Sequence, residues 1–169
     1  MGRRRELQKC LRVLKTFPNS EIGVLIQGWG GNGKSTIAAR LCDRLSDYEK
    51  VVWWRQVDET SLVNKLAAHL RNREQRIALK NGQDELKYRL RDTLETVSPL
   101  LFIFDDFEWN LDYRQGKYIL TPELAEILTA LDWAIRKTNY YHRIIITCRY
   151  EFDSDLLRSF YCLRSLRSL

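Results

Sequence analysis

Two spacings of apolar residues alternate along the chain. Helical spacing, with apolar side chains every three or four positions, marks residues 7–14, 37–45, 59–96 and 124–135. Short, nearly continuous apolar runs lie between and after these stretches, at residues 22–26, 51–57, 100–104, 143–148 and 160–163. Runs of this kind are typical of strands that are buried on both faces. The alternation therefore predicts an α/β fold, in which a parallel sheet of about five strands has helices on both faces.

Local turn and breaker residues limit these elements. Pro18 ends the first helix, because proline disfavours a helical conformation in the residue before it. Asn81 and Gly82 divide residues 59–96 into two helices. Pro122 suits the first turn of a helix, so we expect a helix to begin there. Residues 107–120 are polar and aromatic without a clear period, and we expect a loop.

A glycine-rich segment, "GWGGNGK" at residues 28–34, follows the first predicted strand. Four of its first six residues are glycine, which is entropically costly unless something approaches the backbone closely. Its spacing matches G-x-x-x-x-G-K-[ST], the phosphate-binding loop, and a strand before it and a helix after it are the context that this motif requires. We expect nucleotide phosphates to bind the loop and the first turn of the helix, at Gly28, Gly30, Gly31, Asn32, Gly33, Lys34, Ser35 and Thr36.

Individual side chains around this loop have separate expected roles. Lys34 reaches the β- and γ-phosphates, and the hydroxyl of Ser35 binds Mg²⁺. Asp105 follows the apolar run 100–104 and holds the same ion, through water. Asp106 then stands where a carboxylate accepts a proton from an attacking water, the role of a general base. Glu108 is the alternative for that role, although its position favours a loop residue.

Two polar residues, Thr147 and Arg149, lie at the end of the apolar run 143–148 and are candidates for the same site. If this strand lies between the first and the third, Thr147 and Arg149 face the γ-phosphate and sense its presence. The alternative is that Arg149 pairs with a surface acid.

Composition narrows the class of protein without naming a ligand. The 169 residues suit one domain, and 44% hydrophobic with 30% charged residues is typical of a globular protein. With no apolar run of about 20 residues and no signal-peptide pattern, we expect a cytoplasmic protein that does not enter a membrane. The net charge of +6 includes Arg3, Arg4 and Arg5 and a looser group at residues 71–80; a solvated helical face is favoured over nucleic-acid contact. The four scattered cysteines indicate buried thiols rather than disulfides or zinc ligands, and neither histidine has a nucleophile pattern nearby.

Six segments, taken together and in order, resemble the nucleotide-binding domain of STAND ATPases, the NB-ARC and NACHT-like signalling class of P-loop proteins. They are "GRRREL", "GWGGNGKST", "VVWW", "LFIFDDFEW", "IIITCRY" and "FYCLRSL", and they cover essentially the whole chain. They are similar to the G-R-x-x-E-L box, the phosphate loop, the strand after it, the h-h-h-h-D-D-h-x-W segment, the T-T-R sensor strand and the Y-x-L-x-x-L strand of that class.

The resemblance implies a three-layer P-loop NTPase fold with the sheet order 5-1-4-3-2. It implies ATP or ADP with Mg²⁺ as cofactors, and slow hydrolysis that is weak in an isolated domain. Nucleotide exchange would convert a closed monomer into a homo-oligomer and control flanking effector and sensor domains. By this resemblance Arg3 lies near the adenine and Arg149 acts as the sensor, while Lys34, Ser35, Asp105 and Asp106 keep the roles given above.

Two departures and one length difference qualify the match. Ser35 and Cys148 stand where threonine is commoner, and the second exchange removes a polar contact from the sensor motif. The helical lid, with its G-x-P contact, and the winged-helix domain of this class would lie after residue 169. We therefore expect residues 1–169 to be the nucleotide-binding domain of a larger multidomain protein.

Other functions of a phosphate loop stay open. The basic balance is compatible with an AAA+-type ATPase that acts on DNA as an initiator or loader. A small-molecule kinase would need an arginine-bearing lid, for which the sequence gives no convincing candidate. A GTPase is disfavoured because the chain has no N-K-x-D motif.

Overall fold

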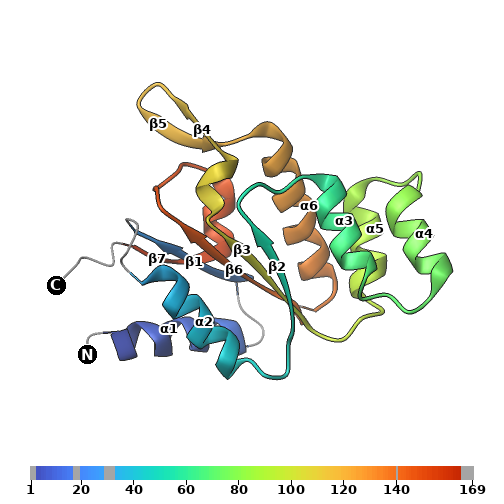
Figure 1. The fold of residues 1–169 in the computed structure, drawn as a ribbon, viewed down its shortest axis with the longest axis horizontal. Coiled ribbons are helices and arrows are strands. Elements are labelled where there is room, and N and C mark those ends of the chain that lie inside the picture. The colour runs from blue at the N-terminus through green and yellow to red at the C-terminus, as the bar shows by residue number, and fades with distance from the viewer. Residues whose placement is uncertain (1–2, 17–19, 29–32, 140, 165–169) are drawn as a thin grey trace.

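Five parallel strands form the central sheet of the computed structural model, which describes residues 3–16, 20–28, 33–139 and 141–164 (Figure 1). Across the sheet the strands are β2 (Glu49–Trp54), β3 (Leu100–Asp105), β6 (Arg143–Cys148), β1 (Gly23–Gln27) and β7 (Phe160–Leu163). The labels β4 and β5 belong to a separate hairpin. Counted along the chain without that hairpin, the order reads 5-1-4-3-2, as the resemblance implies, and all four pairings are parallel.

Helices cover both faces of this sheet and make three layers (Figure 1). On one face lie α1 (Arg3–Lys15) and α2 (Lys34–Arg44), which bury apolar side chains against alternate residues of the strands, such as Val24, Ile103 and Ile145. On the other face lie α3 (Glu59–Ala67), α5 (Leu86–Leu94) and α6 (Pro122–Lys137), with α4 (Arg73–Asn81) packed on α3 and α5. The intervening strand residues, including Leu25 and Phe102, face that second core. Burial on both faces explains why the strands read as continuous apolar runs.

Two sequence predictions about local structure are wrong. Residues 59–96 form three helices rather than two, because Asn72 begins α4 by accepting hydrogen bonds from the backbone N–H groups of Glu74 and Gln75. Residues 107–120 are not a loop: they form a 3₁₀ turn, η1 (Phe107–Asn110), and the hairpin β4 (Leu111–Arg114) and β5 (Lys117–Leu120). Gln115 and Gly116 both have positive φ, which is the backbone of a two-residue hairpin turn. The short strands have too few residues to show a period.

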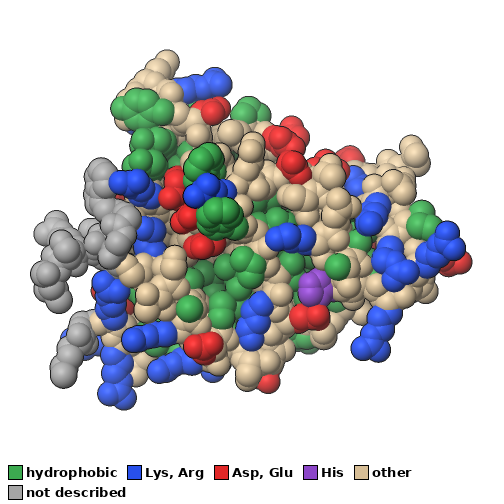
Figure 2. All heavy atoms as spheres, viewed as in Figure 1, with side chains coloured by type: hydrophobic (Ala, Val, Ile, Leu, Met, Phe, Trp, Pro, Cys, Tyr) green, Lys and Arg blue, Asp and Glu red, His purple; other side chains and the backbone are tan. Residues whose placement is uncertain are grey.

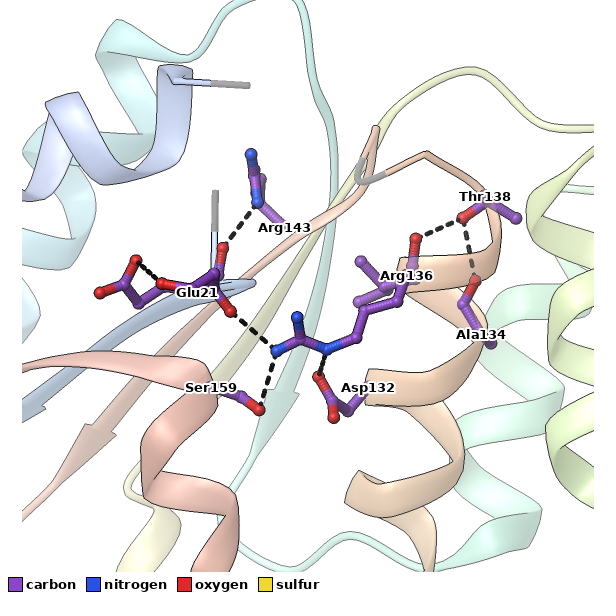
Figure 3. Close-up of polar contacts among 9 residues, drawn as sticks. Glu21, Asp132, Ala134, Arg136, Thr138, Arg143 and Ser159 are labelled. Carbon is purple, nitrogen blue, oxygen red and sulfur yellow. Dashed lines mark hydrogen bonds and ion pairs between the residues drawn. The ribbon is translucent and has the colours of Figure 1, made fainter. Parts of the chain in front are cut away.

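The amino ends of the strands are closed by arginines that donate to the backbone (Figure 3). Arg143, fully buried at the start of β6, donates to the carbonyl groups of Thr16 and Glu21 at 2.9 and 3.0 Å. Arg136 of α6 donates to the carbonyl of Ser20 at 2.8 Å and to the hydroxyl of Ser159 at 3.1 Å. These bonds fix the segment between α1 and β1 to the sheet and to α6. This end of the sheet therefore has a structural role.

A buried histidine completes the same end of the sheet. The Nδ1 atom of His142 accepts a hydrogen bond from the backbone N–H of Leu100 at 3.0 Å, and its Nε2 lies 2.8 Å from the carbonyl oxygen of Leu94. This arrangement suits the neutral ring, with its proton on Nε2. Burial lowers the pKa of His142, and the hydrogen bond to Leu94 opposes that effect.

Candidate functional site

The phosphate-loop motif lies at the carboxyl end of β1, in the middle of the sheet. The backbone N–H of Gly28 donates to the carbonyl of Cys148 at 3.1 Å, which fixes the start of the motif to the end of β6. Residues 29–32, and with them the predicted phosphate ligands Gly30, Gly31 and Asn32, lie outside the described residues. The motif resumes at Gly33, directly before α2. The predicted strand–loop–helix context is therefore present.

Gly33 cannot be replaced by another residue without strain. Its φ is +78°, a left-handed conformation, and a Cβ placed there would lie 1.9 Å from Nη1 of Arg3. The backbone of the motif is thus open to a close approach, which the Arg3 side chain makes in this structure. Arg3, which the resemblance places near the adenine, lies beside the end of the phosphate loop and the start of α2.

The first turn of α2 provides a setting for an anion. Lys34 is only 8% exposed, whereas Ser35 and Thr36 are exposed. No acidic residue occupies this turn, and no side chain caps it among the described residues. The N-terminus of a helix favours negative charge, because its first N–H groups have no partner within the helix. Together with the open backbone at Gly33, these residues fit a bound phosphate group.

Asp105 and Thr147 meet between the carboxyl ends of β3 and β6. The hydroxyl of Thr147 donates to Oδ1 of Asp105 at 2.5 Å and accepts from the backbone N–H of Asp106 at 3.1 Å. Thr147 is completely buried, and Asp105 is half-buried. Oxygen donors of this kind suit Mg²⁺, which keeps several waters and takes few protein ligands. Among the described residues there is no group of three His, Cys, Asp or Glu side chains that would hold a metal by themselves.

The two candidate bases lie on opposite sides of Asp105. Asp106 has a left-handed backbone, with φ of 52°, and its Oδ2 accepts a hydrogen bond from the indole Nε1 of Trp54 on β2 at 3.0 Å. Glu108 faces β6 instead, where its Oε2 accepts from the backbone N–H of Arg149 at 3.3 Å. Both carboxylates are half-buried. The structure thus brings Asp106 close to Asp105 and Thr147, and it places Glu108 against the predicted sensor.

The end of β6 contains the predicted sensor residue and the unusual cysteine. The side chain of Arg149 is exposed, and its guanidinium lies 5.7 Å from the ring centre of Tyr150. The Cys148 thiol is buried, and burial raises its pKa to about 12, with a smaller rise from Glu108 and a smaller opposing effect of Lys34. Lys34 and Glu108 therefore both lie within electrostatic reach of Cys148. A thiol with so high a pKa is unreactive. Its S–H, a weaker donor than a threonine hydroxyl, donates to the carbonyl of Tyr150 at 3.2 Å.

The sequence did not single out the aromatic cluster beside Asp106. The guanidinium of Arg55 lies 3.9 Å from the ring centre of Trp54 and 4.7 Å from that of Trp109, so the arginine is held between two tryptophans. Each tryptophan is 58% exposed. Asn110 is buried below them and joins the end of β2 to η1: it accepts from the N–H of Val57 at 2.9 Å and donates to the carbonyl of Arg55 at 2.9 Å. In the sequence, the feature that could have indicated this cluster is an asparagine within an aromatic stretch.

The two basic groups of the sequence lie in different settings. Lys and Arg side chains gather over α1 and α2 (Figure 2), where Arg4, Arg5, Lys9 and Arg12 are exposed. By contrast, Arg76 in the other basic group donates to the carbonyl oxygens of Leu70 and Arg71 and thereby holds the segment between α3 and α4 against α4. Within the described ranges, no helix has the length and apolar character needed to cross a membrane.

Comparisons with known proteins agree with this geometry. A family model, the NB-ARC domain, matches residues 3–150. No curated protein is significantly similar to the chain. Among solved structures, Cdc6p from Pyrobaculum aerophilum is similar, with a TM-score of 0.57 and 16% sequence identity over 88% of this chain and 39% of that one. At this identity the likeness shows the fold alone.

Two further solved structures are more distant. AMPPCP-bound DnaA from Aquifex aeolicus has a TM-score of 0.46 and 16% identity, over 94% of this chain and 43% of that one. Pif1 from a Bacteroides species, in complex with ADP-AlF4, has a TM-score of 0.45 and 16% identity, over 88% of this chain and 32% of that one. The chain spans less than half the length of each of these three structures.

Proposed function

The chain belongs to the NB-ARC family of STAND P-loop ATPase domains, and from this premise we propose that it is a switch that binds ATP or ADP with Mg²⁺ and hydrolyses ATP slowly. One observation carries the proposal. Two residues lie at the same end of the sheet, one on each side of β6. Lys34 begins α2, which follows β1 and Gly33, and Asp105, which accepts a hydrogen bond from Thr147, ends β3. Ligands bind at this end of open α/β sheets.

Each residue has a part in this proposal. The backbone around Gly33 and the ammonium group of Lys34 bind the β- and γ-phosphates, while Ser35 and Asp105 hold Mg²⁺. When bound, the metal neutralises charge on the phosphate oxygens. Thr147 keeps Asp105 in place by its hydrogen bond, and Arg149 reports whether the γ-phosphate is present. Asp106 accepts the proton of the attacking water.

The wider biological role is also a proposal. In the full-length protein this domain would control flanking effector and sensor domains through a nucleotide-dependent change from monomer to homo-oligomer. The support is the NB-ARC match over residues 3–150. Phosphoryl transfer depends on charge stabilisation that a closing partner or arginine commonly completes.

The exposed cations on α1 and α2 support one alternative, an ATPase that acts on DNA. Contacts between such cations and phosphates release counterions, so binding to DNA would weaken steeply with rising salt. Titration of double-stranded DNA at about 50 mM and about 200 mM salt, at constant nucleotide, separates the two functions. A loss of affinity of about 10³-fold or more across that range would favour the DNA-acting ATPase.

Nucleotide binding is tested by Lys34→Ala. We expect the affinity for Mg-ATP to fall at least about tenfold, equivalent to about 1.4 kcal/mol, because the variant lacks the buried cation beside the phosphate cradle. Isothermal titration calorimetry measures the change. Lys80→Ala is the matched control, because Lys80 is an exposed lysine on α4, away from the site. Unchanged affinity in Lys34→Ala would overturn the site assignment.

A further inference from the structure

The Asp106 carboxylate has a specific partner that the reaction chemistry does not require. The indole Nε1–H of Trp54 donates to Oδ2 of Asp106 at 3.0 Å, across from β2 to the turn that follows β3. A single hydrogen bond to one carboxylate oxygen sets the orientation of the group and leaves the second oxygen for another ligand. Groups that orient a catalytic base in this way are a general feature of active sites.

The ring of Trp54 packs on a neighbouring arginine. The Arg55 guanidinium lies 3.9 Å from the ring centre of Trp54 and 4.7 Å from that of Trp109. Such contacts between cations and aromatic rings contribute about 0.5–1 kcal/mol at exposed sites. The exposed Trp54 ring is therefore stacked rather than freely rotating.

The backbone beneath this stack is also fixed. The N–H of Arg55 donates to the carbonyl of Asp105 at 2.8 Å, and Asn110 bonds to the backbone of both turns. Arg55 and Asp106 both have left-handed backbones, with φ of 64° and 52°. Because non-glycine residues seldom adopt this conformation, both turns are held by their surroundings in an unusual shape. The result aims the Trp54 indole at Asp106.

We propose that Trp54 is the positioning residue for Asp106: its indole N–H fixes the carboxylate so that one oxygen faces the attacking water. Trp54 does not touch the nucleotide and acts only through Asp106. The inference rests on the proposed function, because an oriented base has an effect only where ATP is hydrolysed. Glu108, which faces Arg149, has no part in it.

The contact itself is testable without nucleotide. The five tryptophans give five indole N–H resonances in a ¹⁵N-labelled protein, and Trp54→Phe and Trp109→Phe each remove one and so assign two of them. In Asp106→Asn the acceptor becomes a neutral amide, a weaker partner than a carboxylate. We expect the Trp54 indole resonance to move and the Trp109 resonance to stay. An unmoved Trp54 resonance would overturn the proposal.

The functional consequence is measured by single-turnover hydrolysis of Mg-ATP with the protein in excess. We expect Trp54→Phe to lower the rate constant about tenfold, at the low end of what outer-shell partners contribute in enzymes. Its affinity for Mg-ATP should be unchanged. Trp109→Phe is the matched control, because Trp109 has the same exposure and contacts the same arginine, and its hydrogen bond to Asp106 runs from its backbone N–H to the Asp106 carbonyl, which the variant keeps. We expect its rate constant to stay close to that of the wild type.

The double variant Trp54→Phe/Asp106→Asn decides whether Trp54 acts through Asp106. If it does, the double variant hydrolyses ATP as fast as Asp106→Asn alone, because the group being positioned is already absent. A further loss in the double variant, or an equal loss in Trp109→Phe, would overturn the proposal. A wild type that binds ATP without hydrolysing it faster than Lys34→Ala would also overturn it, while the proposed nucleotide binding would stand. If ATP binding itself is absent, the proposed function fails, and the NMR result still decides whether Trp54 and Asp106 are in contact.

Discussion

The two ends of the central sheet use charged side chains in opposite ways. At the amino ends, Arg143 is fully buried and its guanidinium donates to backbone carbonyl oxygens, as does that of Arg136. At the carboxyl ends, Lys34 begins α2 after the phosphate loop and Asp105 ends β3, and Ser35 and Arg149 are exposed. The cations at the first end stabilise the fold, and we propose that those at the second bind a ligand. Variants at the two ends should therefore differ in which property they change.

Arg143→Met should have the largest effect, and the effect should be on stability. The variant removes the buried guanidinium, so the carbonyl groups of Thr16 and Glu21 lose part-buried hydrogen bonds. An unsatisfied buried group costs about 1–3 kcal/mol, and because these two groups are only part-buried we expect the low end, a fall of about 2 kcal/mol in the free energy of unfolding. Urea denaturation measures it, and Arg12→Met on the exposed face of α1 should change it by less than about 0.5 kcal/mol. Equal stability of the two variants would contradict the structural role of Arg143.

Asp105→Ala should change ligand binding with little loss of stability. Asp105 is half-buried at the carboxyl end of β3, and the hydroxyl of its partner Thr147 still accepts from the backbone N–H of Asp106 in the variant. We expect the gain in ATP affinity on addition of Mg²⁺, which we estimate as about tenfold or more in the wild type, to disappear in this variant. In Asp106→Asn that gain should persist while hydrolysis slows by about 10²-fold, a typical contribution of a general base. Loss of the magnesium effect in both variants would contradict the division of roles.

The smallest effect should come from the titration of His142. Its pKa is lowered in the folded protein by burial, relative to an ordinary value of 6.5. The unfolded chain then binds more protons than the folded protein when the pH falls below about 6.5, so stability is complete above that pH and declines below it. Urea midpoints at about pH 7.5 and about pH 5.5 measure the decline, and His142→Asn, which has no titrating ring, should show less of it. An equal decline in the variant would assign the effect to other groups.

The central sheet and the core of the site could be predicted from the sequence, because each rests on a local pattern. The run 143–148 coincides with β6, since the strand is buried on both faces and its middle residues are all isoleucine. The phosphate-loop motif needs only a strand before it and a helix after it, and both are present. The sheet order came from the resemblance rather than from the spacing of residues.

Other features depend on contacts between distant segments and have no local signal. The predicted second strand, 51–57, is β2 at 49–54, because Arg55 adopts a left-handed conformation and leaves the sheet. That turn brings Trp54 to Asp106, a contact between residues 52 positions apart. The hairpin of β4 and β5 was also missed, since its strands have four residues each and most of its side chains are exposed or only partly buried. The periodicity of apolar residues indicates which side chains are buried in a large core. These short elements have few such side chains, so their sequences show no clear period.

The position of β6 between β1 and β3 also sets a length scale for the ligand. Neighbouring strands lie about 4.8 Å apart, so the strand that leads into the phosphate loop and the strand that ends in Asp105 are separated by roughly 9.6 Å. Hydrogen bonds from Gly28 to Cys148 and from Thr147 to Asp105 fix both neighbours to β6 and keep this spacing constant. This spacing leaves room between the two strand ends for the nucleotide phosphates and the metal ion that we propose to bind there.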